Sequence, residues 1–226
     1  MIIPVYNEAP YIREVIDRVR RAALPEGVAR EVIVVDDGST DGTAAALAAM
    51  DADPSLRVLH SAVNGGKGTA IRSGIASAFG DIVLIQDADL EYDPEDHAAL
   101  IAPIRDGRAA VVYGSRFLGS ISDMRLANRI ANLLLRWAVN LMYGSRLTDE
   151  ATAYKAFRAD VLREMRFSAR RFEWCPEVTA KTLRRGHRIV EVPVRYRARS
   201  LAQGKKIRWW DLFHALWTLV RYRFVA

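Results

Sequence analysis

The sequence contains a single cysteine, Cys175, among its 226 residues. One cysteine excludes a disulfide within the chain and leaves no thiolate cluster for a structural zinc site. A chain without disulfides is typical of a reducing compartment, so we expect a cytoplasmic protein. The histidines also lack the spacing of metal ligands, and we expect them to be structural or exposed: His60, His97, His187 and His214.

Long apolar runs are also absent. No stretch approaches the roughly 18 uninterrupted apolar residues of a membrane-spanning helix. No signal peptide is visible, because Met1 leads directly into an expected strand. The chain has no long-period repeats and no low-complexity tracts. Since 50% of the residues are hydrophobic, we expect a single domain over residues 1–226 with a substantial core.

Acidic residues are fewer than basic ones, 27 against 33, which gives a net charge of +6. This excess favours anionic partners, such as nucleoside diphosphates, nucleic acid or an acidic membrane surface. The aromatic residues do not form a stacking pattern, and no nucleic-acid-binding motif is present. We therefore expect no nucleic-acid partner.

Strand and helix patterns alternate over about the first 115 residues, which predicts an α/β fold. Its sheet should be mostly parallel, with helices on both faces. The expected strands cover residues 2–5, 31–36, 56–59, 82–85 and 109–113. No Gly-x-Gly-x-x-Gly follows the first strand, and the glycine-rich loop at residues 64–68 lacks the P-loop spacing. A dehydrogenase and a P-loop nucleotidase are both disfavoured.

The alternation stops after residue 113. Residues 114–117 should lead into a long helix with one apolar face, formed by Leu126, Ile130, Leu134, Trp137 and Leu141. Further along, we expect a turn into a strand from residue 147, a basic helix over 178–183, a strand over 189–196 and an aromatic helix over 209–224.

Asp87 and Asp89 follow the apolar run at residues 82–85. Two carboxylates at the end of a strand can converge on one Mg²⁺ or Mn²⁺ ion, which completes its coordination with phosphate and water. Taken alone, the pair also fits a solvated turn. It is not an EF-hand loop, because Glu91 and Tyr92 stand in the loop and the sharp-turn glycine is missing. We expect a metal-bound diphosphate at this edge of the sheet.

Four segments in this order resemble family 2 glycosyltransferases of the nucleotide-sugar-binding GT-A fold. They are Pro-Val-Tyr-Asn-Glu at residues 4–8, Val-Asp-Asp-Gly-Ser-Thr-Asp-Gly at 35–42, Asn-Gly-Gly-Lys-Gly at 64–68 and Gln-Asp-Ala-Asp-Leu at 86–90. Later segments, at residues 112–117, 147–149, 154–158, 191–193 and 204–207, are similar to the branch of dolichyl-phosphate mannose synthase and bacterial polyprenyl-phosphate sugar transferases.

The resemblance implies a nucleotide-sugar-binding half over residues 1–115, an acceptor-binding half over 116–208 and a C-terminal helix over 209–226. The roles that it implies are as follows: Pro4, Tyr6, Glu8 and Asp37 hold the nucleoside, Lys67 approaches the nucleotide, Asp87 and Asp89 hold the metal, Arg116 and Arg129 face the acceptor phosphate or the departing charge, and Arg199 and Lys205 close over the donor.

Several of these residues also have simpler explanations. Tyr6 fits a core position, and Arg116, Arg129 and Lys205 fit plain surface charge. Asp36 fits a turn cap, so we favour Asp37 over it as the nucleoside ligand.

Two positions depart from the family pattern. Relatives usually carry a glutamate two positions after Asp149, where this chain has Ala151, and an acidic residue just before Pro176, where it has Cys175.

The resemblance implies metal-dependent transfer of a sugar, with inversion, from a nucleoside-diphosphate sugar to a polyprenyl phosphate. A phosphate acceptor needs cations, whereas a polysaccharide hydroxyl would need a base, for which Asp149 is the candidate. A haloacid-dehalogenase-type phosphatase also uses Asp-x-Asp, but after its first strand. Aromatic and basic residues over 204–224, including Trp209 and Trp210, predict peripheral binding to the cytoplasmic face of the membrane. The sequence does not predict the oligomeric state.

Overall fold

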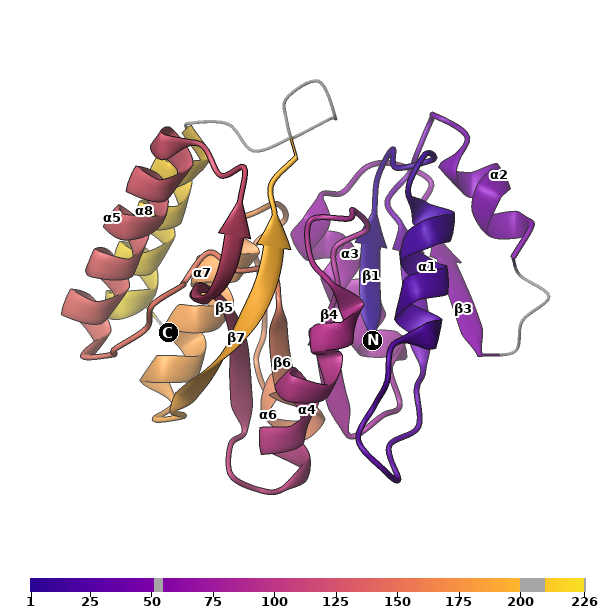
Figure 1. Ribbon diagram of the computed structural model, residues 1–226. Helices are drawn as coiled ribbons and strands as arrows, with labels where there is room; N and C mark the ends of the chain where they lie inside the picture. The colour runs from indigo at the N-terminus through magenta and orange to yellow at the C-terminus, as the bar shows by residue number, and fades with distance from the viewer. Residues whose placement is uncertain (51–54, 200–209, 226) are drawn as a thin grey trace.

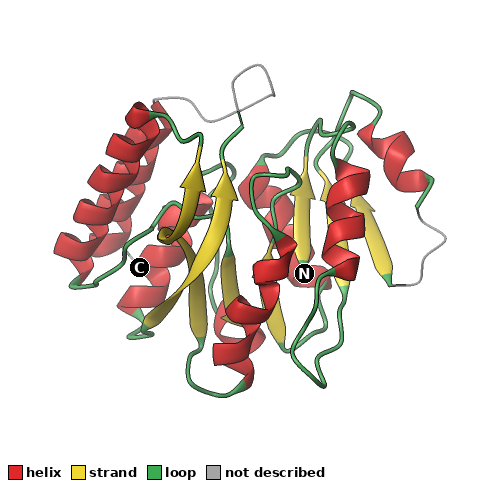
Figure 2. Ribbon diagram, in the orientation of Figure 1, coloured by secondary structure: helices red, strands yellow, loops and turns green. Residues whose placement is uncertain are grey.

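The computed structural model of the protein describes residues 1–50, 55–199 and 210–225. Seven strands form one sheet in the order β3-β2-β1-β4-β6-β5-β7, with helices on both faces (Figures 1 and 2). The strands are β1 Ile2–Val5, β2 Val32–Asp36, β3 Leu56–His60, β4 Ile82–Ile85, β5 Val111–Ser122, β6 Lys155–Arg158 and β7 Ile189–Arg197. The expected α/β class is therefore confirmed.

The helices divide between the two faces of the sheet. They are α1 Ile12–Arg21, α2 Thr43–Ala48, α3 Lys67–Ser77, α4 His97–Arg105 after a short 3₁₀ helix Pro94–Asp96, α5 Leu126–Tyr143, α6 Ala159–Arg163, α7 Trp174–Arg184 and α8 Trp210–Phe224. Helices α1 and α2 cover one half of the first face and α4 covers the other. Helices α3 and α5 to α8 cover the opposite face.

Strand β1 shows why the predicted strands are apolar throughout. Ile2 packs into the core on the α3 side, and Ile3 packs into the core on the α1 side. Successive side chains of a strand point to opposite faces, and a parallel sheet covered on both sides buries every one of them. Gly74 allows α3 to lie close to β1, because a side chain there would collide with Ile2.

Strands β1 to β4 are parallel, and the sheet order reverses between β1 and β4. From β1 the chain moves outward to β2 and β3, and it then returns to place β4 on the other side of β1. In open α/β sheets this reversal opens a crevice at the carboxyl ends of the strands, where ligands bind. Strand β6 runs antiparallel to both β4 and β5, so the sheet is mixed rather than wholly parallel.

Strand β5 continues well beyond the predicted end at residue 113. It runs to Ser122, and its pairing with β7 shifts register between Ser115 and Ser120. The segment 114–117, which was predicted to connect the strand to the long helix, is therefore part of the strand, and the helix begins only at Leu126. Glycine and serine weaken the strand pattern in this segment, and pairing with β7 supplies the order that local propensity does not. Helix α4 was not predicted at all.

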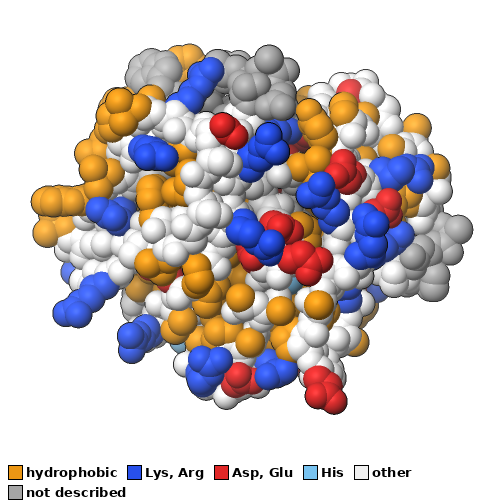
Figure 3. Space-filling view, viewed as in Figure 1, with side chains coloured by type: hydrophobic (Ala, Val, Ile, Leu, Met, Phe, Trp, Pro, Cys, Tyr) orange, Lys and Arg blue, Asp and Glu red, His pale blue; other side chains and the backbone are white. Residues whose placement is uncertain are grey.

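The long helix α5 is present, and its predicted apolar stripe lies largely in solvent. Trp137 is 69% exposed and Leu141 is 82% exposed, whereas Leu135 and Val139 are buried against the sheet. Helix α8 lies beside α5 and also exposes aromatic residues, including Trp217 (Figure 1). Apolar side chains accordingly gather on the α5 side of the molecule (left in Figure 3). None of the helices in the described ranges combines the length and apolar character that a membrane span requires.

Candidate active site

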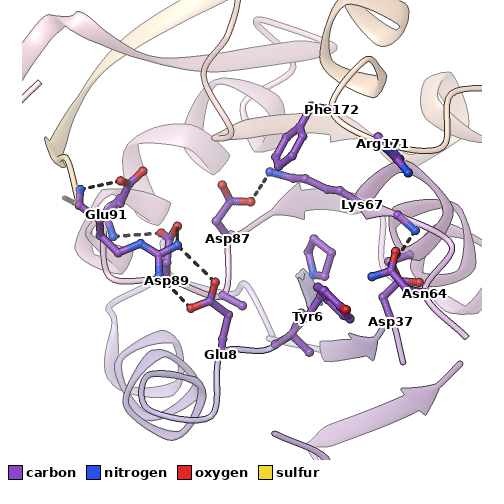
Figure 4. A pocket seen from close by; sticks show the side chains of 16 residues that line it. Tyr6, Glu8, Asp37, Asn64, Lys67, Asp87, Asp89, Glu91, Arg171 and Phe172 are labelled. Atoms are coloured by element: carbon purple, nitrogen blue, oxygen red, sulfur yellow. Dashed lines mark hydrogen bonds and ion pairs between the residues drawn. The ribbon is translucent and has the colours of Figure 1, made fainter. Parts of the chain in front are cut away.

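A cavity of about 300 Å³ opens where the sheet order reverses (Figure 4). One wall is the turn after β1, which contains Tyr6 and Glu8, and another is the turn after β4, which contains Asp87 and Asp89. The remaining lining comes from residues after β2, at the start of α3 and beside α7. Eight predicted donor-site residues line this one cavity: Pro4, Tyr6, Glu8, Asp37, Lys67, Asp87, Asp89 and Arg199.

Hydrogen bonds fix the turn after β1 to the turn after β2. Asn7 has a positive φ of 52°, and its Oδ1 accepts a hydrogen bond from the Thr40 amide at 2.7 Å. The amide of Glu8 donates to Thr43 Oγ1 at 3.0 Å, and the amide of Ala9 donates to Asp41 Oδ2 at 3.1 Å. These bonds place Glu8 at the cavity with little freedom to move.

Asp37 organises the glycine-rich loop before α3. Its carboxylate accepts hydrogen bonds from the amides of Gly65 at 2.9 Å and Gly66 at 2.7 Å. Gly66 has a φ of 89°, and a side chain there would also collide with the main chain of Arg170, so the position requires glycine. The loop directs Lys67 into the cavity. Asp36 instead accepts from the Ser39 amide and pairs with His60, as a turn-capping residue does.

Each aspartate of the predicted metal pair faces a cation. Lys67 Nζ donates to Asp87 Oδ1, and Arg199 Nη2 lies 2.8 Å from Asp89 Oδ2. Arg199 Nη1 also pairs with Glu8 at 2.8 Å. The Arg199 main-chain amide donates to Glu91 Oε1 at 2.6 Å, which fixes the end of β7 to the turn after β4.

Negative charge accumulates in this cavity. Burial, together with the nearby charges of Asp87 and Glu91, raises the pKa of Asp89 to about 7, although Arg199 acts in the opposite direction. Burial alone would lower the pKa of Lys67, but Asp87, Cys175 and Asp89 together raise it above its ordinary value. Carboxylates that are this crowded fit a divalent cation.

The described residues contain no group of three or more His, Cys, Asp or Glu side chains placed to hold a metal. Asp87 and Asp89 would therefore supply two ligands, and phosphate oxygens and water would supply the rest. That division is usual for Mg²⁺ bound with nucleotides.

A second cavity, of about 330 Å³, continues from the first. Lys67, Asp87, Glu91 and Phe172 line both. Beyond them the second cavity passes Arg116 and reaches helices α5 and α8. Apolar side chains dominate that end, including Ile130, Leu135, Leu212 and Ala215.

Arg116 lines the second cavity and forms a buried ion pair with Asp149. Arg116 Nε lies 2.7 Å from Asp149 Oδ2, and Nη2 lies 2.7 Å from Oδ1. The Asp149 side chain is fully buried and lines neither cavity. Both of its oxygens are engaged by Arg116, so this geometry gives Asp149 a positioning role and does not support the general-base role expected for a hydroxyl acceptor.

One predicted residue, Arg129, is not brought to the site, and another, Lys205, is not described. Arg129 lies near the start of α5, is exposed and lines neither cavity. Of the two arginines, Arg116 alone lines the second cavity. Lys205 lies outside the described residues, as does Trp209, so the predicted role of that segment stays a prediction.

Four polar or aromatic residues of the first cavity were given no site role from the sequence: Asn64, Glu91, Arg171 and Phe172. Asn64 and Glu91 lie within or beside the motifs at residues 64–68 and 86–90, which could have indicated them. Arg171 and Phe172 precede α7 in a segment without a motif. Only the tertiary fold brings them to the glycine-rich loop, where the centroid of the Phe172 ring lies 5.8 Å from Lys67 Nζ.

A buried hydrogen-bond network supports the turn that carries Asp87. The Gln86 side chain donates to the Asp87 carbonyl at 2.9 Å. Its Oε1 accepts from Tyr154 at 2.7 Å and contacts His97 Nε2 at 2.8 Å. Burial and the charge of Arg30 lower the pKa of His97 to about 3. His97 is therefore neutral, and its Nε2 carries the proton, because Gln86 Oε1 can only accept.

The model of the family described as "Glycosyl transferase family 2" matches residues 1–166 of the chain. The chain belongs to glycosyl transferase family 2. It is a glycosyltransferase, and membership of this family excludes the haloacid-dehalogenase-type phosphatase considered above. The matched residues contain both aspartates, Lys67 and the buried pair of Arg116 and Asp149.

Named relatives of this family 2 enzyme act on lipid phosphates. It is 35% identical over 218 residues to an undecaprenyl-phosphate mannosyltransferase of Micrococcus luteus, with 90% of this chain and 85% of the relative covered. It is 29% identical over 210 residues to an undecaprenyl-phosphate 4-deoxy-4-formamido-L-arabinose transferase of Edwardsiella ictaluri. That match covers 91% of this chain and 62% of the relative.

Solved structures share the fold of the family 2 enzyme. A glucosyl-3-phosphoglycerate synthase from Mycobacterium tuberculosis, solved with Mn²⁺, UDP-glucose and phosphoglyceric acid, matches with a TM-score of 0.73 at 25% identity. The match covers 100% of this chain and 79% of that one. A second structure of the same synthase matches with a TM-score of 0.76 at 23% identity. The expected GT-A fold is confirmed.

Proposed function

We propose that the enzyme transfers a sugar from a nucleoside-diphosphate sugar to the phosphate of a polyprenyl lipid, with inversion and with a divalent cation. One observation carries this proposal. The carboxylate pair of Asp87 and Asp89 lies at a cavity that carries many charged side chains, and this cavity joins a second one that contains Arg116 and ends among apolar side chains of α5 and α8. The two cavities fit a charged donor and a lipid-phosphate acceptor, on either side of the position of the transferred sugar.

The donor lies in the first cavity. Pro4, Tyr6 and Asp37 hold the nucleoside, and Lys67 and Arg199 face its diphosphate. A Mg²⁺ or Mn²⁺ ion held by Asp87 and Asp89 stabilises the negative charge that develops on the leaving diphosphate. Lys67 and Arg199 stabilise the same negative charge, because these cations are already in position before the reaction.

The acceptor phosphate lies in the second cavity, near Arg116. A phosphate monoester has a second pKa of about 6, so it is mostly ionised at neutral pH and needs no base to activate it. It needs a cation that orients it, and the buried bidentate pair with Asp149 holds the Arg116 guanidinium in one orientation. The apolar lining toward α5 and α8 suits the first isoprene units of the lipid.

The arrangement of the cavities supports inversion. Lys67, Asp87, Glu91 and Phe172 line both cavities and so mark the region between donor and acceptor. We expect an acceptor that enters from the second cavity to approach the sugar from the side opposite the diphosphate. Attack from that side inverts the configuration of the sugar carbon.

The exposed apolar stripe of α5 and α8 supports docking on the cytoplasmic face of a membrane. Trp137 and Leu141 on α5 and Trp217 on α8 are exposed, and Arg221 and Arg223 lie in the last turn of α8. Tryptophan favours the membrane interface, and each cation near anionic headgroups contributes about 1 kcal/mol. The second cavity reaches the same two helices, so a docked enzyme could receive its acceptor directly from the bilayer.

A direct test uses sugar nucleotides, undecaprenyl phosphate and Mn²⁺. We expect one sugar nucleotide in a panel to raise the melting temperature only with Mn²⁺, and to donate its sugar to undecaprenyl phosphate but not to undecaprenol. Asp89→Asn should abolish transfer and the Mn²⁺-dependent shift. Asp93→Asn is the matched control, because Asp93 lies in the same turn but pairs with Arg195 at the surface. Full transfer by Asp89→Asn with chelator would contradict the metal site. Transfer to undecaprenol alone would contradict the phosphate acceptor.

A further inference from the structure

Three residues from two segments of the chain meet on one wall of the second cavity. Glu150, Ala151 and Cys175 all line it, alongside Asp87 and Lys67 of the donor site. Ala151 and Cys175 are the two positions at which the resemblance led us to expect acidic residues. None of the roles assigned so far uses these three side chains.

Glu150 is 1% exposed, and one of its carboxyl oxygens lacks a partner. Oε1 is 3.1 Å from Thr179 Oγ1, and Oε2 meets no hydrogen-bond donor within residues 1–50, 55–199 and 210–225. Thr179 has only one hydroxyl hydrogen, and its Oγ1 also lies 2.9 Å from the Cys175 carbonyl oxygen. Since the carbonyl can only accept, that hydrogen is shared between two acceptors if Glu150 is ionised.

No cation in the described part of the chain compensates for this shortage of donors. Lys155 is buried nearby, but its ammonium donates to the main-chain carbonyl of Glu150 at 2.7 Å and lies 3.5 Å from the Tyr113 ring centroid. Burial raises the pKa of Glu150, although Lys155 acts in the opposite direction. An uncharged carboxyl accounts for this environment, because it can donate a hydrogen bond of its own.

The position of this wall follows from the order of the substrates. The diphosphate lies at Asp87 and Lys67, and the acceptor phosphate lies near Arg116. The sugar that passes between them must occupy the part of the second cavity next to Asp87. Glu150, Ala151 and Cys175 line that cavity together with both sets of charged residues.

We propose that Glu150, Ala151 and Cys175 form the binding wall for the transferred sugar. Glu150 donates a hydrogen bond to one sugar hydroxyl. Ala151 and Cys175 contact a carbon-rich edge of the ring and select a sugar that presents few hydroxyls there. This inference rests on the proposed function, since it places the sugar of that donor.

Cys175 allows a test in the unaltered protein, because it is the only cysteine in the sequence. The panel is GDP-mannose, UDP-glucose, UDP-N-acetylglucosamine and UDP-glucuronic acid with Mn²⁺, and the donor that stabilises the protein most is used. Iodoacetamide should label Cys175 in the free protein. The donor should slow labelling at least fivefold, and its nucleoside diphosphate alone should slow it less than twofold.

Three outcomes of this labelling experiment would overturn the inference. Equal protection by donor and nucleoside diphosphate would show that the sugar does not cover the thiol. No protection by a donor that stabilises the protein would show the same. Since burial raises the pKa of Cys175, labelling is repeated at alkaline pH, and no labelling of the free protein even there would show that the thiol does not face the cavity. If no sugar nucleotide binds at all, the proposed function fails as well, which separates the two results.

Substitutions at Glu150 provide an independent measurement. Glu150→Leu should weaken donor binding about tenfold, as expected for the loss of one buried hydrogen bond, and leave nucleoside diphosphate binding unchanged. Glu150→Gln keeps an uncharged donor and should bind within about threefold of the native protein. Glu164→Leu, at an exposed carboxylate, is the control and should change neither affinity. Unchanged donor affinity in folded Glu150→Leu would overturn the role of Glu150.

Discussion

Arg199 Nη2 lies 2.8 Å from Asp89 Oδ2, in a contact that joins the end of β7 to the turn after β4. The same guanidinium pairs with Glu8 at 2.8 Å, and these three side chains are between 8% and 12% exposed. Arg199 therefore neutralises carboxylates that would otherwise repel one another. A cation that binds Asp89 Oδ2 would compete with this contact.

Arg199→Ala should lower the free energy of unfolding of the metal-free protein by about 2 kcal/mol, because it leaves Glu8 and Asp89 without a cation. Mn²⁺ should restore part of this loss by binding the freed carboxylates. Urea denaturation with and without Mn²⁺ measures both effects. Arg197→Ala is the control, since Arg197 is 82% exposed and lies 3.6 Å from Asp123. An equal loss with and without Mn²⁺ would show that Arg199 and the metal do not compete.

Arg116 and Asp149 should be strongly coupled in a double-mutant cycle. Arg116→Met and Asp149→Leu should each lower the free energy of unfolding by about 3 kcal/mol, since each leaves one buried charge unpaired. The double variant should lose less than the sum, by at least about 1.5 kcal/mol. The exposed pair of Arg158 and Asp160 gives the matched control cycle, in which the two losses should be close to additive. Additive losses at Arg116 and Asp149 would contradict the positioning role.

His97 should make the stability of the protein fall at acid pH. Its pKa is about 3 in the folded protein, against 6.5 for a histidine free in water, so protonation favours unfolding. This loss of stability begins as the pH falls below about 6.5 and continues to about 3. At about 1.4 kcal/mol per pH unit, the contribution is about 2 kcal/mol between pH 7 and pH 5.

Urea denaturation at the two pH values measures this contribution. The free energy of unfolding of His97→Gln should differ less between pH 7 and pH 5 than that of the native protein, by the contribution of His97. This holds whatever the effect of the substitution on stability at pH 7. His214→Gln, on the exposed surface of α8, should leave the difference as it is. A native pH dependence in His97→Gln would assign the effect to other groups.

Trp137→Ser combined with Leu141→Ser should weaken binding to anionic liposomes by at least about tenfold. Each change removes a large exposed apolar side chain, and its insertion into the interface contributes more than about 1 kcal/mol. Co-sedimentation at low salt and at high salt separates the apolar and the electrostatic contributions to liposome binding. Phe79→Ser removes a side chain that is 77% exposed outside α5 and α8, so it should have no effect. If the control weakens binding as much as the pair does, α5 does not form the docking surface.

Local sequence predicted the first half of the fold well for a physical reason. Strands such as β2 are buried on both faces, and their runs of valine and isoleucine carry the signal in themselves. The second part of β5 carries no such run, because Gly114, Gly119 and several serines weaken the pattern. Its order comes from β7, more than 60 residues later in the chain.

The apolar face of α5 illustrates a different limit. The spacing of Leu126, Ile130 and Leu134 correctly predicts that they share one face of a helix. It does not predict what that face meets, and here the three residues are 72%, 49% and 48% exposed. Burial depends on the neighbouring elements, which periodicity does not describe.

The candidate site was predictable where its residues follow strands. The turns after β1, β2 and β4 carry short motifs, and parallel strands bring their carboxyl ends to one edge. The partner of Asp149 was not predictable in the same way, because Arg116 is 33 residues away and the pair forms only in the folded chain. The roles of Arg171 and Phe172 depend likewise on long-range packing.

Strand β6 sets a limit on how this enzyme can be divided. It lies between β4 and β5, so both neighbours of β5 come from residues after 150. A chain that ended at residue 115 would leave β5 with no hydrogen-bonded neighbour and β4 with an open edge. During synthesis, the chain must therefore emerge from the ribosome beyond residue 158 before β6 can pair with β4 and β5. Chimeras that join residues 1–115 of one relative to the later residues of another would cut through this sheet, and we expect them to fold poorly.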